Sequence, residues 1–143
     1  MLNLPKLIGH RGVKNLSPEN TIDSISLAKE LGLHWVEFDV KISKDLIPII
    51  FHDDLLERTT NGKGLPVSYF YKDLKKLDAG SFFYNQATKI YIPTFEEVLL
   101  LCENKGISLN IELKPNKGFE KENIASIAKI LNNSKFSNQY YFS

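Results

Sequence analysis

The hydrophobic pattern of the chain switches between the two-residue period of strands and the longer period of helices. Leu7 to Gly9 is a short apolar run, and we predict a short buried strand there. From His34 to Ile42 an apolar set of positions alternates with a more polar set, which is the pattern of a strand. A further apolar run, IPIIF at 47–51, leads into His52 and Asp53.

Three segments have the period of an amphipathic helix, and they lie at 22–32, 94–106 and 124–131. The middle segment begins with Thr94 and Glu97, a capping-box pattern in which each residue can bind the backbone amide of the other. In the last segment four positions predict the buried face of the helix: Ile124, Ile127, Ala128 and Leu131.

The pattern is irregular between 55 and 93. NGKG at 61–64 is a loop signal, and Ser68 to Leu77 predicts a short helix. We interpret this region as a small insertion at about 54–93.

Two more strands are predicted from SLNIELK at 108–114 and from YYFS at 140–143. Strands separated by helices pair in parallel through right-handed crossovers, so the pattern favours an α/β fold of the TIM-type (β/α) barrel kind. A closed barrel takes typically ~250 residues. We therefore expect residues 1–143 to be the N-terminal part of a barrel domain, either as a fragment of a longer chain or with its barrel completed by a second chain or copy.

Composition excludes several classes of partner. The net charge is +1 with no long basic run, so we expect no nucleic-acid binding. No apolar stretch approaches the roughly 20 residues of a membrane span. Cys102 is the only cysteine, which excludes an intrachain disulfide and favours a cytoplasmic location.

Charged and titratable residues gather where the predicted strands end, which is where parallel barrels carry their reactive groups. Because alternate residues of a strand share a face, residues two apart in one strand are expected to point the same way. These residues are His10 and Arg11, then Glu37 and Asp39, then His52 and Asp53, and finally Glu112 and Lys114.

Three of these side chains, Glu37, Asp39 and Glu112, are carboxylates that would repel one another at one point unless a cation lay between them. We therefore predict a site for a divalent cation, and oxygen ligands favour Ca²⁺ or Mg²⁺ over zinc.

The remaining residues fit chemistry on a phosphate group. His10 and His52 are free to act as acid and base, because the pKa of imidazole lies near neutrality. Arg11 and Lys114 are suited to binding an anion. Metal, histidines and cations together indicate phosphoryl transfer.

In their order along the chain, these motifs resemble the glycerophosphodiester phosphodiesterases. The strings are HRG at 10–12, PENT at 18–21, EFDV at 37–40, FHDDLLERTTNG at 51–62, LDAGSFF at 77–83, IPTFEEVL at 92–99 and IELK at 111–114. The resemblance implies a (β/α)8 barrel of the phosphatidylinositol-phosphodiesterase-like kind. It also implies metal-dependent hydrolysis of glycerophosphodiesters to glycerol 3-phosphate and an alcohol, through a cyclic phosphate.

Residue by residue, the resemblance implies His10 and His52 as the acid/base pair and Arg11 and Lys114 on the phosphate. Glu37, Asp39 and Glu112 would be the ligands of the divalent cation. Apart from the resemblance, we expect Glu19 and Asn20 to orient either His10 or a metal ligand, although Asn20 could equally cap the helix that follows. The family commonly has Asp-Gly where this chain has Asp45 and Leu46.

Two alternatives remain open. One is phospholipase D-like cleavage of lysophospholipid or sphingomyelin, and the other is a truncated, non-catalytic remnant that binds a phosphorylated ligand.

Overall fold

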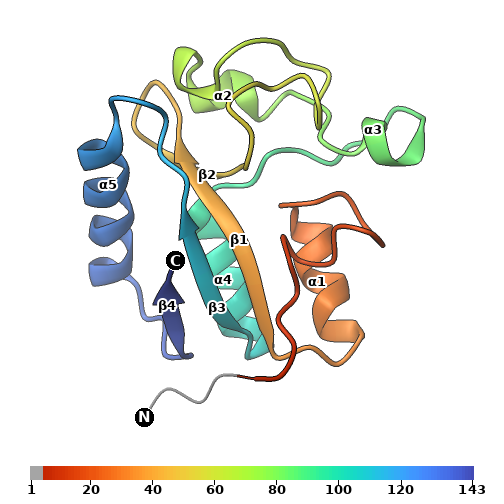
Figure 1. The fold of residues 1–143 in the computed structure, drawn as a ribbon, viewed down its shortest axis with the longest axis vertical. Coiled ribbons are helices and arrows are strands. Elements are labelled where there is room, and N and C mark those ends of the chain that lie inside the picture. The colour runs from red at the N-terminus through yellow and green to blue at the C-terminus, as the bar shows by residue number, and fades with distance from the viewer. Residues whose placement is uncertain (1–4) are drawn as a thin grey trace.

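The computed structural model describes residues 5–143, which form one mixed sheet with helices packed against it (Figure 1). The strands are β1 (Trp35–Ile42), β2 (Pro48–Ile50), β3 (Ser108–Leu113) and β4 (Tyr140–Phe142), and their order across the sheet is β2-β1-β3-β4. The helices are α1 (Ile22–Glu30), the 3₁₀ turn η1 (Pro66–Ser68), α2 (Tyr71–Leu74), α3 (Ser81–Tyr84), α4 (Phe95–Lys105) and α5 (Glu120–Asn133).

Strands that are separated by helices pair in parallel, as the sequence predicts: β1 with β3, and β3 with β4. The apolar run before His52 behaves differently, because β2 pairs antiparallel with β1. Residues 43–47 alone join these two strands, and a parallel crossover needs a dozen or more. The chain therefore turns back, and His52 arrives beside the middle of β1 rather than beyond its end.

The predicted buried strand at Leu7 to Gly9 is wrong in two respects. Gly9 alone pairs with β1, in a single parallel bridge to Val36, and the side chain of Leu7 is 71% exposed. Gly9 donates to the carbonyl of Trp35 and accepts from the amide of Glu37, and Gly12 donates to the Glu37 carbonyl.

Two predicted helices differ from the structure. Within 68–77 only α2 is α-helical, because Tyr69 and Phe70 have extended backbones before it. In α5 the predicted apolar stripe is buried only at Ile127, whereas Ile124 is 54% exposed, Ala128 is exposed and Leu131 is partly exposed. The helix instead buries Asn123, whose amide donates to the Val40 carbonyl of β1.

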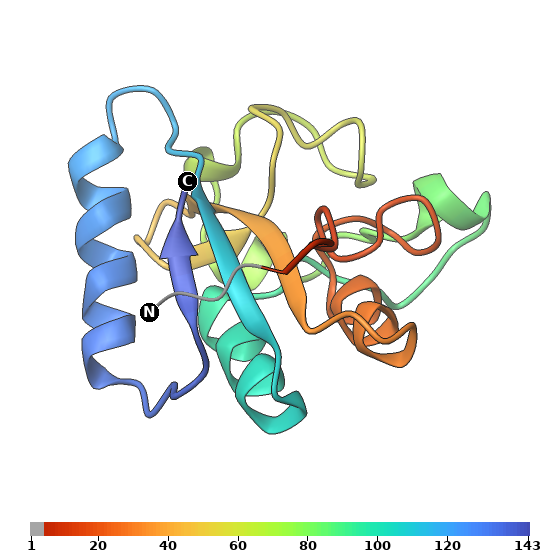
Figure 2. The same ribbon diagram turned by 60° about the horizontal axis from the view of Figure 1, so that its bottom comes forward.

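The main core lies between the sheet and helices α1, α4 and α5, which cover one of its faces (Figure 2). Alternate residues of β1 enter this core, namely Val36, Phe38 and Val40. The other set of β1 residues faces away from the helices and includes Glu37 and Asp39. Apolar helix packing thus leaves the opposite face of the sheet to polar side chains.

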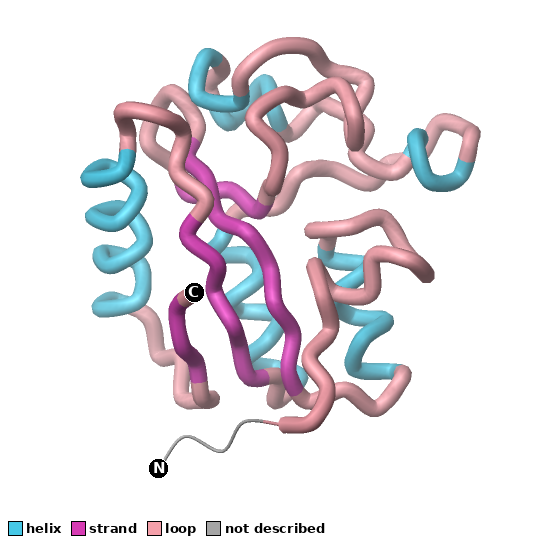
Figure 3. Tube along the Cα trace, in the orientation of Figure 1, coloured by secondary structure: helices cyan, strands magenta, loops and turns pink. Residues whose placement is uncertain are grey.

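The segment 51–93 consists mostly of loops and short helices, and it lies over the carboxyl ends of β1 and β3 (Figure 3). A second, smaller core holds this segment together and includes Phe51, Leu56, Leu74 and Ile92. Within residues 5–143, no helix combines the length and apolarity that crossing a bilayer requires.

Candidate active site

Three carboxylates meet on the polar face of the sheet, as their spacing predicts. Glu37 and Asp39 share one face of β1, and Asp39 stands in register with Glu112 of the parallel strand β3. One carboxylate oxygen from each residue lies within 4.8 Å of the other two. Glu37 is 6% exposed and Asp39 is fully buried, so the cluster sits in a partly dehydrated place.

Hydrogen bonds occupy one oxygen of each buried carboxylate and leave the other oxygen without a hydrogen bond. The backbone amide of Arg11 donates to Glu37 Oε2 at 2.8 Å, and Asn20 Nδ2 donates to Asp39 Oδ2 at 2.9 Å. Glu37 Oε1 and Asp39 Oδ1 are buried and have no hydrogen-bond partner within residues 5–143. Unpartnered buried acceptors are rare because they are costly, and a cation would satisfy both.

The pKa shifts of the carboxylates also point to a bound cation. Burial raises the pKa of Glu37 to about 7, and the charges of Asp39 and Glu112 add to that rise. The pKa of Glu112 is lowered instead, mainly by its hydrogen bond from Lys114. Crowding of negative charge is the condition that a bound divalent cation relieves. The donor set therefore fits a hard, oxygen-bound metal ion.

The loop before α1 owes its shape to unusual backbone angles. Arg11 has φ 52°, Gly12 has φ 77° and Asn20 has φ 57°. A Cβ atom on Gly12 would lie 2.3 Å from Ser24 Oγ, so only glycine fits there. That hydroxyl donates to the Arg11 carbonyl and accepts from the Val13 amide, which fixes the turn that aims the Arg11 amide at Glu37.

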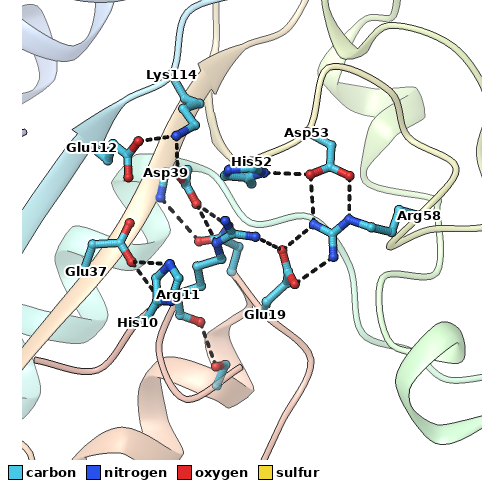
Figure 4. Close-up of polar contacts among 12 residues, drawn as sticks. His10, Arg11, Glu19, Glu37, Asp39, His52, Asp53, Arg58, Glu112 and Lys114 are labelled. Carbon is cyan, nitrogen blue, oxygen red and sulfur yellow. Dashed lines mark hydrogen bonds and ion pairs between the residues drawn. The ribbon is translucent and has the colours of Figure 1, made fainter. Parts of the chain in front are cut away.

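The two candidate histidines approach the carboxylates from different loops (Figure 4). His10 Nε2 lies 3.8 Å from Glu37 Oε2, and the His10 side chain is 53% exposed. Burial lowers the pKa of His10, and the charges of Lys14 and Arg11 lower it further. His52 comes from the loop after β2, and its Nδ1 lies 2.6 Å from Asp53 Oδ1.

The two candidate phosphate-binding cations border the same cluster (Figure 4). Arg11 Nε lies 3.4 Å from Asp39 Oδ2, and Lys114 Nζ lies 3.7 Å from Asp39 Oδ1 while also bonding to Glu112. A pocket of about 500 Å³ opens beside Lys114 and His52, with Lys41 also in its lining. Lys114 therefore gives an anion in this pocket a positive partner next to His52, whereas Arg11 lies outside the pocket lining.

Of the two residues expected to orient His10 or a metal ligand, Asn20 contacts the ligand Asp39, whereas Glu19 contacts Arg11 and Arg58. Asn20 reaches Asp39 through both ends of its amide, since its Oδ1 also accepts from the Asp39 backbone at 3.3 Å. The helix cap is Thr21 instead, so the alternative role of Asn20 as cap is wrong. Glu19 accepts a hydrogen bond from Arg11 at 2.8 Å.

Two residues without a role predicted from the sequence also belong to this arrangement, namely Asp53, which was expected at a strand end beside His52, and Arg58. Arg58 binds both Asp53 and Glu19, and so joins the 51–64 loop to the loop before α1. A carboxylate next to a candidate catalytic histidine was the available signal, because such pairs commonly fix the histidine ring. Nothing in a loop sequence indicates where Arg58 would reach.

Comparison with known proteins agrees with this arrangement. Residues 10–138 match the glycerophosphoryl diester phosphodiesterase family. A glycerophosphodiester phosphodiesterase of Bacillus altitudinis is 41% identical over 112 residues, which are 78% of this chain and 46% of that protein.

Solved structures give the same result. A phosphodiesterase of Oleispira antarctica, in complex with the product sn-glycerol-3-phosphate, is 43% identical with a TM-score of 0.93, covering 97% of this chain and 57% of that one. A glycerophosphodiester phosphodiesterase of Agrobacterium tumefaciens is 28% identical with a TM-score of 0.78, covering 97% and 58%.

This chain thus spans about half the length of the proteins that it matches. It has the α/β fold of their TIM-type barrel over that half. Both its sequence and its structure place the chain in the glycerophosphoryl diester phosphodiesterase family.

Proposed function

We propose that the protein hydrolyses glycerophosphodiesters to glycerol 3-phosphate and an alcohol. The observation that carries the proposal is the meeting of three carboxylates between two histidines and two cations. Two buried oxygens of these carboxylates have no hydrogen bond within residues 5–143. The product-bound relative supports the substrate class, because glycerol 3-phosphate is the phosphate-bearing half of such a diester.

Glu37, Asp39 and Glu112 would hold the divalent cation, and oxygen ligands favour Ca²⁺ or Mg²⁺. When bound, such an ion polarises phosphate and hydroxyl oxygens and offsets the charge that develops on them. Asn20 keeps Asp39 oriented so that its free oxygen faces the other two carboxylates, and Glu19 keeps the Arg11 side chain in place.

Arg11 and Lys114 bind the phosphate group of the diester and turn it toward the histidines. One histidine takes the proton of a glycerol hydroxyl while that oxygen bonds to phosphorus. The other gives its proton to the oxygen of the departing alcohol as the P–O bond breaks. Water then opens the resulting cyclic phosphate with the proton roles exchanged, which yields glycerol 3-phosphate and restores both histidines.

An assay of glycerol 3-phosphate release tests the proposal. Purified protein is given glycerophosphocholine or glycerophosphoethanolamine, with Ca²⁺, with Mg²⁺ or with a chelator. Loss of general acid or base catalysis typically costs 10²- to 10⁴-fold, and we expect His10→Ala and His52→Ala to lose about that much. The third histidine, His34, is exposed and lies away from the site, so His34→Ala serves as the matched control.

Release that needs metal and both site histidines, and that survives His34→Ala, supports the enzyme. A correctly folded protein that releases no glycerol 3-phosphate under any of these conditions contradicts it and favours a non-catalytic phosphate-binding remnant.

We further propose that additional polypeptide completes the barrel beside β4. The edge strand supports this, because Tyr140 and Phe142 are 41% and 47% exposed on it. Unpaired strand edges with apolar side chains tend to pair with another strand.

We also propose a cytoplasmic location. The buried Cys102 thiol and the absence of an intrachain disulfide are compatible with it.

A further inference from the structure

Arg58 is the centre of an ion-pair network that reaches both halves of the candidate site (Figure 4). Its guanidinium donates hydrogen bonds to Asp53 from Nε and from one terminal nitrogen, at 2.5 and 2.8 Å. It donates to Glu19 from both terminal nitrogens, at 2.9 and 2.7 Å. Four N–H donors in a rigid fork serve two carboxylates, a geometry that the single ammonium of lysine does not reproduce.

On one side the network determines which nitrogen of His52 carries a proton. Hydrogen bonding to Arg58 lowers the pKa of Asp53 to about 2, so its carboxylate is ionised and only accepts. Because Asp53 Oδ1 lies 2.6 Å from His52 Nδ1, that nitrogen must be the donor. The neutral ring then keeps its lone pair on Nε2, which leaves Nε2 as the nitrogen that exchanges protons with substrate.

On the other side the network holds Arg11. Glu19 Oε1 accepts from Arg58 at 2.7 Å and from Arg11 at 2.8 Å, so one oxygen joins the two guanidinium groups. The Glu19 side chain is 9% exposed, which limits competition from water. Arg58 itself is 47% exposed and lies outside the group of residues that would touch substrate.

We propose that Arg58 is a positioning residue that, through Asp53, holds His52 in the tautomer with a proton on Nδ1 and, through Glu19, fixes the Arg11 side chain. This inference rests on the proposed function for its catalytic consequence, and on the contacts alone for the tautomer. It makes the 51–64 loop part of the acid/base apparatus.

The tautomer is measured directly by nitrogen NMR on protein labelled with ¹⁵N-histidine, at alkaline pH where imidazoles are neutral. The His52 signals are assigned by their loss in His52→Ala. We expect a protonated Nδ1 and an unprotonated Nε2 in the wild type. Arg58→Gln should give a mixture of tautomers, and Asp53→Asn should move the proton to Nε2, because the asparagine amide can donate to Nδ1.

Lys75→Gln is the matched control. Lys75 is 46% exposed and pairs with Glu97 at 3.0 Å, so its removal breaks a comparable ion pair away from the site. We expect the wild-type tautomer to persist in Lys75→Gln. In kinetics, Arg58→Gln should lower kcat about 10- to 100-fold, the usual scale for residues that orient a catalytic group, whereas Lys75→Gln should not.

The outcomes separate the two proposals. Active protein whose His52 tautomer and kcat are unchanged in both Arg58→Gln and Asp53→Asn overturns the positioning role and leaves the function intact. A tautomer shift in protein that turns over no glycerophosphodiester supports the positioning role and contradicts the function. Asp53→Asn gives an independent readout if Arg58→Gln fails to fold.

Discussion

At the scale of single residues, the site depends on which oxygen of each carboxylate is already used. Arg11 and Asn20 hold one oxygen each of Glu37 and Asp39, and both do so from left-handed backbone positions that other L-residues rarely adopt. Strained backbone of this kind is common where structure serves function. The candidate residues are recognisable from their types, whereas this division of labour between oxygens is a property of loop geometry.

Leu46 shows the same backbone strain away from the site. It has φ 59° in the turn between β1 and β2, where the sequence has leucine in place of the family's common glycine. A left-handed conformation costs an L-residue about 1–2 kcal/mol, whereas glycine costs about 0.5–1 kcal/mol in chain entropy. The Leu46 side chain is 45% exposed and that of Leu55 is 50% exposed, so removing either one loses a similar amount of burial.

We therefore expect Leu46→Gly to leave the free energy of unfolding about 1–2 kcal/mol higher than Leu55→Gly does, measured by urea denaturation. Leu55→Gly is the control, because Leu55 is 50% exposed and has a negative φ. It should destabilise the protein. Equal destabilisation by both changes would show that the turn stores no strain.

At the scale of elements, the capping box shows how closely local sequence can predict structure. Thr94 Oγ1 accepts from the Glu97 amide at 3.1 Å, and Glu97 Oε2 accepts from the Thr94 amide at 2.8 Å. The helix ends at Gly106, whose φ is 61°. All of these contacts fall within one or two turns, so the pattern specifies them without knowledge of the fold.

Replacing the cap tests its contribution. Thr94→Ala should lower the free energy of unfolding by about 1 kcal/mol, because an amide at the helix start loses its partner. Thr94→Ser keeps the hydroxyl and should retain most of that stability. Denaturant midpoints of the two variants give the comparison, and indistinguishable midpoints would refute the cap as a source of stability.

Elements whose form depends on distant neighbours were predicted less well. The mostly exposed face of α5 depends on what packs beside it. The antiparallel direction of β2 is a different case, because the short turn that causes it is local and could have been read from the sequence. The carboxylate cluster could be predicted because a strand period of two puts Glu37 and Asp39 on one face, and a parallel neighbour adds Glu112. The link from His52 to Arg58 could not, because it lies within a loop that has no regular period.

At the scale of the whole molecule, the chain forms half of a barrel whose helices cover one face of a sheet and whose opposite face is polar. The helices fix the sheet through apolar packing, and the sheet in turn fixes the height at which the three carboxylates meet. The loops around them supply histidines and cations. The parallel register of β1 and β3 thus brings the three carboxylates together.

The most direct test of this account is a calorimetric titration of the protein with Ca²⁺ and with Mg²⁺, which needs neither substrate nor turnover. The account predicts one ion bound per chain, with binding lost in Asp39→Asn and in Glu112→Gln. Asp73→Asn, which removes an exposed carboxylate paired with Lys76, should leave binding unchanged. Wild-type protein that binds neither ion, or an Asp39→Asn variant that binds as well as wild type, would contradict it.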